Sequence, residues 1–186
     1  MGLFIRRKFS KQTGKLKSLL ELALSRVAIA RRPRLARKSI ASGDVCQLLA
    51  LGQLDRAVHR AEQVIQEDNM LEALGIIELY CKCLVEKAAQ LDKPQECSEE
   101  IKEATAGIIF AAKWCNDLPE LQFARKILTD KFGDDFAAEA REGTAFVDPM
   151  LVWKLSGDTT NMELKKKVTK QIAAENDMSV DFSHPI

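Results

Sequence analysis

Five cysteines and two histidines are the side chains of this chain best suited to bind a metal ion or to attack a substrate. They are Cys46, Cys81, Cys83, Cys97 and Cys115, with His59 and His184. Cys81 and Cys83 lie two residues apart, so on a helix they point to different sides and cannot hold one zinc ion together. We therefore expect free thiols in a reducing compartment, no metal and no cofactor. This pattern favours a cytoplasmic protein.

Paired carboxylates can act as general acid and base, and Glu67-Asp68 is an acidic pair inside an otherwise apolar helical pattern. Asp68 lies four residues after Val64 and three before Leu71, which places it on the packing face. A second catalytic group, a phosphate loop and a Ser/His/Asp or Cys/His set are not found at convincing spacing. We predict that Asp68 pairs with a basic residue of the first helix and that the protein is not an enzyme.

Basic side chains are concentrated at the N-terminal end of the chain. Residues 1–38 contain twelve Lys or Arg and a single acid, Glu21, although the whole chain has 28 basic and 27 acidic residues. This asymmetry predicts contact with an anionic surface, either an acidic membrane or the acidic part of a neighbouring copy. The cations expected to form the contact are Lys11, Lys15, Lys17, Arg26, Arg31, Arg32, Arg34, Arg37 and Lys38.

The first residues carry a separate signal. Leu3, Phe4 and Ile5 form an apolar tip directly before Arg6 and further cations. The tip could enter the interface of an anionic membrane, or it could be a frayed end that packs nowhere. Residue 6 is not the Ser or Thr of a myristoylation signal, and no apolar run approaches the roughly 20 residues that span a bilayer.

Two long helical patterns must position these side chains. One runs from Leu54 to about Gln90, and its apolar residues recur at steps of three and four. The other starts between Ser10 and Thr13 and ends at Gly52, which suits the left-handed position after a helix. Because only a short turn separates the two, we predict a long antiparallel hairpin.

The first helix is expected to be irregular at two places. Pro33 should bend or break it near Arg32. Ser42, Gly43 and Asp44 should add a second kink or an N-cap.

Shorter helices are expected after the hairpin. Following a loop over 91–97, Ser98 should cap a third helix, and Asp117 should cap a fourth that has Pro119 in its first turn and ends at Gly133. Two short helices over 134–141 and 149–156 follow. The pattern as a whole predicts an all-α fold.

A last amphipathic helix begins at Asn161, and its narrow apolar stripe suggests a helix that can dock on a larger surface and leave it. The tail from Met178 carries no helical pattern. We therefore divide the chain into a helical domain at 1–178 and an unstructured tail at 179–186.

Several stretches together resemble the increased sodium tolerance family, the divergent branch of the ESCRT-III proteins. The main signature is RAEQVIQEDNMLEALGIIELYCKCL, and it is preceded by QLLALGQLDRA. The ARK at residues 36–38 and the later FVDPMLVWKLS fit the same family. The resemblance covers roughly residues 4–178.

The resemblance implies a long helical hairpin, two shorter packed helices, a linker helix and a C-terminal helix folded back. It also implies an adaptor or assembly protein of endosomal multivesicular body sorting, peripheral on endosomal membranes. Such proteins bind a charged multivesicular body protein, polymerise with it and regulate the AAA ATPase that disassembles the polymer. By this resemblance Leu164, Val168 and Ile172 contribute to the groove for the partner's C-terminal helix. The alternative is that these residues pack only within the chain.

Two features depart from the family pattern. The segment 42–46 is about five residues longer, which must be absorbed by a kink, a bulge or a loop near the hairpin tip. The family's C-terminal motif for the ATPase is not found in these 186 residues. A function of another class, a helical nucleic-acid binder, would use the same N-terminal cations, but no known reading motif accompanies them.

Overall fold

The computed structural model describes residues 8–183, and these form helices without any strand. Two long helices, α1 (Lys11–Ala50) and α2 (Leu54–Glu86), form the predicted antiparallel hairpin. The chain divides into two compact units, each of which contains part of both long helices. The apolar tip at Leu3–Ile5 and the end of the tail, 184–186, lie outside the described residues.

The hairpin turn has the predicted chemistry. Gly52 adopts a φ of 73°, a conformation that costs a residue with a Cβ atom but not glycine. Its N–H donates to the Leu49 carbonyl, and the N–H of Gln53 donates to the Leu48 carbonyl at 2.9 Å. This pair of bonds is a Schellman motif, which satisfies the last carbonyls of α1 and reverses the chain within three residues.

The predicted break at Pro33 is wrong, because α1 continues through it. Proline removes the hydrogen bond that would reach the carbonyl of Ile29 four residues earlier. Pro33 and Ile29 both lie on the exposed side of α1, so water can donate to that carbonyl instead. The missing bond is therefore tolerated without interrupting the helix.

The N-cap that was one alternative at Ser42–Asp44 is also wrong, because α1 continues through the segment 42–46. Ala41 and Val45, which flank Ser42–Asp44, are completely buried. Asp44 reaches across the hairpin to Arg60, with 2.9 Å between Oδ2 and Nη2. These contacts outweigh the low helix propensity of Gly43 and Asp44, which is a preference of less than about 1 kcal/mol per residue.

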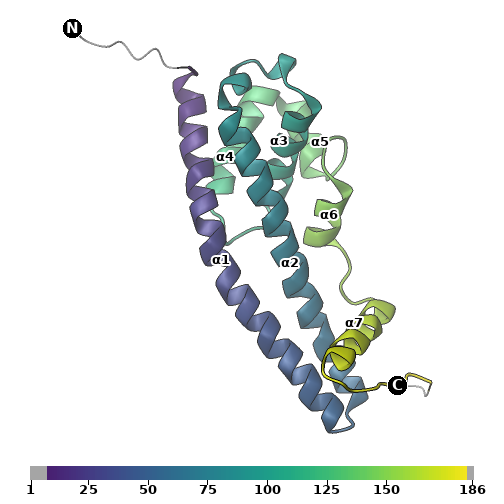
Figure 1. The fold of residues 1–186 in the computed structure, drawn as a ribbon. Helices are drawn as coiled ribbons and strands as arrows, with labels where there is room; N and C mark the ends of the chain where they lie inside the picture. The colour runs from purple at the N-terminus through teal and green to yellow at the C-terminus, as the bar shows by residue number, and fades with distance from the viewer. Residues whose placement is uncertain (1–7, 184–186) are drawn as a thin grey trace. The chain divides into compact units, whose positions relative to one another are not determined.

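The first unit comprises residues 1–30 and 73–156. Besides its parts of α1 and α2 it contains four α-helices that gather beside α2 in Figure 1. They are α3 (Glu99–Ala112), α4 (Glu120–Phe132), α5 (Asp134–Arg141) and α6 (Pro149–Ser156). The connection from α2 to α3 consists of two 3₁₀ turns, η1 (Ala88–Asp92) and η2 (Pro94–Glu96), so α2 ends before the predicted Gln90.

Helix α3 is the central element of the first unit. Ser98 caps it as predicted, its hydroxyl accepting from the N–H of Ile101 at 3.4 Å. Residues 104–112 are buried without interruption, so this part of α3 is covered on all sides. Gly107 permits this, because a Cβ atom there would lie 2.2 Å from the ring of Tyr80.

Helix α4 begins differently from the prediction. Pro119 occupies the position before its first residue, and Asp117 lies in the preceding turn. Backbone carbonyls organise this start, since the N–H of Leu121 donates to Leu118 and the N–H of Gln122 donates to Pro119. Gly133, with a φ of 94°, ends α4 as predicted.

The second unit comprises residues 31–72 and 157–186. It contains the hairpin turn, the adjoining parts of α1 and α2, and α7 (Met162–Glu175), which Figure 1 shows near the turn. Its core is a small cluster in which α7 supplies Ile172 and the hairpin supplies the other members. Those members are Ala41, Val45, Ala57, Ala61 and Val64.

None of the helices within residues 8–183 has the length and apolar character needed to cross a membrane.

Candidate partner-binding site

Helix α7 and the hairpin beneath it form the candidate site, because the sequence places its predicted partner-binding residues there. Helix α7 begins directly after Asn161, close to the predicted start, and the Asn161 side-chain oxygen caps it by accepting from the N–H of Leu164 at 3.0 Å. The N–H of Met178 donates to the Ala173 carbonyl at 2.8 Å, so the chain turns back after the helix. Both ends of α7 are therefore fixed by local hydrogen bonds.

The docked face of α7 is broader than its apolar stripe. Thr169 and Ala173 are buried beside Ile172, and the Thr169 hydroxyl donates to the Lys165 carbonyl at 2.7 Å. Thr169 thereby satisfies its own polar group within the helix, which removes most of the cost of burying it. A second row of residues, one position after the apolar row, completes the interface.

Lys165 begins that second row and is 7% exposed. Its ammonium lies 3.1 Å from a carboxylate oxygen of Glu62 on α2. A buried ammonium is tolerated only with such a partner, since an unpaired one would lose several kcal/mol of hydration. A longer contact of 3.4 Å joins Gln66 to Thr159, just before α7. The ion pair specifies how α7 sits on α2.

The three predicted partner-binding residues have different environments. Ile172 is 6% exposed and belongs to the core of the second unit. Val168 is half-buried and packs against the same core, and Leu164 is also half-buried. Leu164 and Val168 are therefore the members of the set with surface open to another molecule.

The tail beyond α7 covers part of the hairpin turn. Residues 178–181 line a hollow of about 330 Å³ together with Leu49, Gly52 and Leu54. The ring of Phe182 lies under the ammonium groups of Lys166 and Lys170, 5.8 and 5.3 Å from its centroid. Residues 179–183 have no helix or strand, but these contacts give them a defined course.

Several cations of the predicted anionic contact are engaged inside the second unit. Arg37 and Arg34 place nitrogen atoms 2.8 and 3.2 Å from the Glu67 carboxylate, which is 5% exposed. The Gln63 amide donates to the same carboxylate at 2.9 Å. Lys38 pairs with Asp68 at 2.7 Å, which confirms the predicted ionic contact of Asp68 with the first helix.

The sequence nevertheless assigned the buried role to the wrong acid of this pair. The Asp68 side chain is 46% exposed, whereas Glu67 is enclosed by two guanidinium groups. Consecutive residues differ by about 100° around a helix, so placing the packing face one position too late exchanges their environments. Arg34 and Arg37 are thus structural partners of Glu67.

In the first unit, Arg26 forms an ion pair with the buried Glu120 of α4. Lys17 lies 3.9 Å from Glu21 and over the ring of Phe9. Lys11 and Lys15 are exposed, and no described residue of the chain forms an ion pair with them. Arg32 of the second unit is also exposed and forms no ion pair with a described residue. Arg31, in contrast, has an interaction within the chain.

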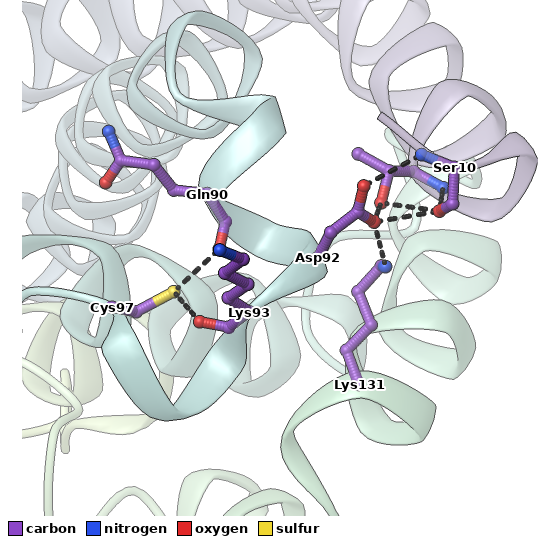
Figure 2. Close-up of polar contacts among 7 residues, drawn as sticks. Ser10, Gln90, Asp92, Lys93, Cys97 and Lys131 are labelled. Atoms are coloured by element: carbon purple, nitrogen blue, oxygen red, sulfur yellow. Dashed lines mark hydrogen bonds and ion pairs between the residues drawn. The ribbon is translucent and has the colours of Figure 1, made fainter. Parts of the chain in front are cut away.

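A carboxylate that the sequence did not single out fixes the start of α1 (Figure 2). Asp92 accepts from the N–H and the hydroxyl of Ser10, both at 2.8 Å, and from the Thr13 hydroxyl at 2.6 Å. Lys131 of α4 lies 3.3 Å away. These donors, the Thr13 hydroxyl first among them, hold the pKa of Asp92 well below its usual range.

The cysteines are thiols, and the described residues contain no group of three His, Cys, Asp or Glu able to hold a metal ion. Burial raises the pKa of the Cys81 thiol to about 12, so it is neutral and unreactive at physiological pH. Cys97 donates to the carbonyls of Gln90 and Lys93, as Figure 2 shows, and so closes the 3₁₀ connection.

Sequence reasoning missed Lys165, Glu62 and Asp92. The partners of these residues are far away along the chain, and Asp92 and Thr13 are 79 positions apart. A weak signal exists for Lys165, because it begins a row with Thr169 and Ala173 at four-residue steps. No comparable signal marks Asp92, which lies in what the sequence predicts to be a loop.

Comparison with known families shows a match over most of the chain. The family model for Ist1, described as a regulator of Vps4 activity in the MVB pathway, matches residues 17–179. The vacuolar protein sorting-associated protein IST1 of Saccharomyces cerevisiae is 25% identical over 174 residues, 89% of this chain and 58% of that protein. An IST1-like protein of Dictyostelium discoideum is 27% identical over 160 residues, 86% of this chain and 43% of that protein. The chain thus spans about half the length of these curated relatives.

A solved structure has the same fold. It is the N-terminal domain of S. cerevisiae Ist1 in complex with a Did2 MIM motif, with a TM-score of 0.80 and 24% sequence identity. The match covers 96% of this chain and all of that one. The predicted hairpin with packed shorter helices and a C-terminal helix folded back is confirmed.

Proposed function

The chain belongs to the Ist1 family, and we propose that it is a non-catalytic adaptor that regulates the Vps4 ATPase in the multivesicular body pathway. The adaptor binds a charged multivesicular body protein and assembles with it on the cytoplasmic face of endosomal membranes. The related yeast domain was crystallised with a Did2 MIM motif, which supports a short helical motif as the ligand. The docked α7 is the single observation that carries this proposal.

Helix α7 is suited to this role because its attachment is limited. One large apolar side chain, Ile172, enters the core of the second unit, and the ion pair of Lys165 with Glu62 fixes the orientation. Leu164 and Val168 flank this anchor and keep exposed surface. A partner helix that packs along them would bury apolar area worth about 25 cal/mol per Å².

The proposed division of roles is that Leu164 and Val168 contact the partner and Ile172 holds α7 in place. Apolar side chains that an interface removes from water contribute to binding, and the half-buried Leu164 and Val168 on the docked helix can be covered in this way. Ile172→Asp should abolish binding by undocking α7, because it would bury an unpaired carboxylate.

Titration calorimetry with the C-terminal helical peptide of a charged multivesicular body protein tests these roles. Leu164→Asp and Val168→Asp are expected to weaken binding at least tenfold, the equivalent of about 1.4 kcal/mol. Ala174→Asp is the matched control, since it adds the same charge to an exposed position of the same helix. Unchanged affinity in folded Leu164→Asp and Val168→Asp variants would show that α7 is not the binding site.

For the membrane contact, the members of the predicted cation set that form no ion pair with a described residue carry the proposal. In the first unit they are Lys11 and Lys15, and in the second unit Arg32. Each cation near an anionic surface contributes about 1 kcal/mol at physiological salt. Lys11→Glu with Lys15→Glu should abolish co-sedimentation with vesicles that contain phosphatidylserine. Co-sedimentation that ignores lipid charge and added salt would contradict the membrane contact.

A further inference from the structure

Ser10 lies immediately before α1 and is exposed. Its hydroxyl oxygen accepts from the N–H of Thr13 at 3.2 Å, which caps the helix, and its hydroxyl proton is donated to Asp92 at 2.8 Å. Figure 2 shows that the Asp92 carboxylate lies between Ser10 and Lys131 of α4. This one carboxylate therefore connects the start of α1 to η1 and α4, all within the first unit.

The sequence before Ser10 is strongly basic. Arg6, Arg7 and Lys8 precede it by four, three and two residues. Protein kinases select substrates in part by charge, and one class has an acidic groove that takes basic residues at these positions, above all an arginine three residues before the serine. Arg7 has that spacing from Ser10.

We propose that Ser10 is a phosphorylation site for a kinase of this basic-directed class, and that the phosphate breaks the contact between the start of α1 and Asp92. In the reaction the Ser10 Oγ attacks the γ-phosphorus of ATP, and the bond from that phosphorus to the leaving ADP oxygen breaks. The hydroxyl proton passes to the catalytic aspartate of the kinase.

The break follows from charge. A phosphoserine carries about −1.5 to −2 charges at neutral pH, and its oxygen no longer has a proton to donate. It would face the Asp92 carboxylate, which is ionised at neutral pH. Lys131, 3.3 Å from Asp92, supplies only one positive charge against the combined negative charge of the phosphate and the carboxylate. The helix N-terminus favours the phosphate, so α1 persists while Asp92 and η1 separate from it.

Neighbouring hydroxyl groups do not share these features. Thr13 is completely buried, so a kinase cannot reach it. Ser18 and Ser25 are exposed, but they lie inside α1 and donate to the carbonyls of Gly14 and Glu21. A kinase binds its substrate segment in an extended form, which residues inside a helix cannot adopt without unfolding it. Ser10 precedes the first helical residue.

The first test is phosphate incorporation into the full chain by a basic-directed kinase with ATP, located by mass spectrometry. One phosphate is expected on Ser10, lost in Ser10→Ala and reduced at least tenfold in Arg7→Ala. Ser18→Ala is the matched control and should be modified like the wild type. A peptide of residues 3–14 monitors the kinase. An unmodified Ser10 in the full chain overturns the proposal, whether or not the peptide is modified.

The second test measures amide hydrogen exchange on the phosphorylated chain. Exchange in η1, residues 88–92, is expected to rise about tenfold, as the loss of charge-assisted hydrogen bonds predicts. The control is phosphorylated Asp92→Asn, whose neutral amide can donate to the phosphate. In that variant phosphorylation should leave exchange in η1 unchanged or slow it. Equal exchange of η1 before and after phosphorylation of the wild-type chain overturns the proposed break.

Discussion

The two units of this protein are stabilised in different ways. The twelve largest fully buried side chains among residues 8–183 all belong to the first unit, and α3 supplies Ile101, Ile108 and Ile109 to them. The core cluster of the second unit that contains Ile172 is otherwise made of alanine and valine residues. Ion pairs also join this unit's parts of α1 and α2, and in the most buried of them Glu67 pairs with Arg34 and Arg37.

This difference has a physical consequence. Burial of large apolar side chains is non-directional and almost independent of salt, so the first unit should act as a stable scaffold. Small side chains bury little area, and ion pairs add orientation more than net stability. The second unit is therefore the part from which a docked helix such as α7 can detach at the lower cost.

The largest effect is expected from a truncation in the core of the first unit. Ile109 is 1% exposed on α3, and Ile109→Ala removes apolar contacts and leaves a cavity. The free energy of unfolding should fall by about 4 kcal/mol, measured by urea denaturation. Leu79→Ala, a truncation of an exposed side chain in the same unit, is the control and should cost less than about 1 kcal/mol. If Ile109→Ala lowers the free energy of unfolding by less than about 1 kcal/mol, the first unit is not an apolar scaffold.

A second effect is expected from the charged centre of the second unit. Glu67→Gln keeps the shape but leaves two guanidinium groups without their carboxylate, at an expected cost of about 2–3 kcal/mol. The cost stays below that of a fully buried pair because the Arg37 side chain is half exposed. Glu163→Gln, an exposed position on α7, is the matched control. Equal stability of the two variants would show that the ion pairs do not hold this unit.

The sequence predicted the parts of this structure that depend on local chemistry. Gly52, Ser98 and Asn161 end or begin helices as expected, because their backbone conformation or side chain acts within three residues. Helical periodicity likewise identified the hairpin. The predicted break at Pro33 and the predicted cap at Ser42–Asp44 were wrong, since water and the contacts of α2 compensate there for poor local propensity.

The candidate site was less accessible to sequence reasoning. Periodicity found Ile172, because a docked helix must present an apolar face. It could not find the pairing of Lys165 with Glu62, or of Glu67 with Arg34 and Arg37, since charged residues are usually solvated and their partners lie on other helices. Long-range ion pairs become predictable only when the helices have been placed side by side.

A smaller loss of stability is expected when the polar contact of Asp92 with the start of α1 is weakened than when the apolar core of the first unit is truncated. Asp92→Asn should cost roughly 1–2 kcal/mol at pH 7, because a neutral amide accepts more weakly than a carboxylate. The folded-state pKa of Asp92 is lowered, so its contribution is fully present above the unfolded value of about 3.9 and is lost as pH falls below it. The stability gap between wild type and variant should therefore close below about pH 4.

Thermal unfolding of both proteins between pH 7 and pH 2 measures this gap. Asp181, an exposed carboxylate that accepts from the N–H of Ser183 in the second unit, is the control, and Asp181→Asn should leave stability nearly unchanged at every pH. A gap for Asp92→Asn that persists unchanged at pH 2 would mean that the carboxylate charge is not what fixes the start of α1.

The smallest effect is expected for α7 and separates docking from stability. Lys165→Met removes the ammonium but keeps the aliphatic chain, so Glu62, whose side chain is 22% exposed, can turn to water. We expect a loss of about 1 kcal/mol or less in overall stability, but faster amide exchange throughout α7. Lys167→Met, at an exposed position two residues later, should change neither quantity. If α7 exchanges at the same rate in Lys165→Met and in wild type, its position depends on Ile172 and its neighbours alone, and the charged character attributed to the second unit does not extend to its docked helix.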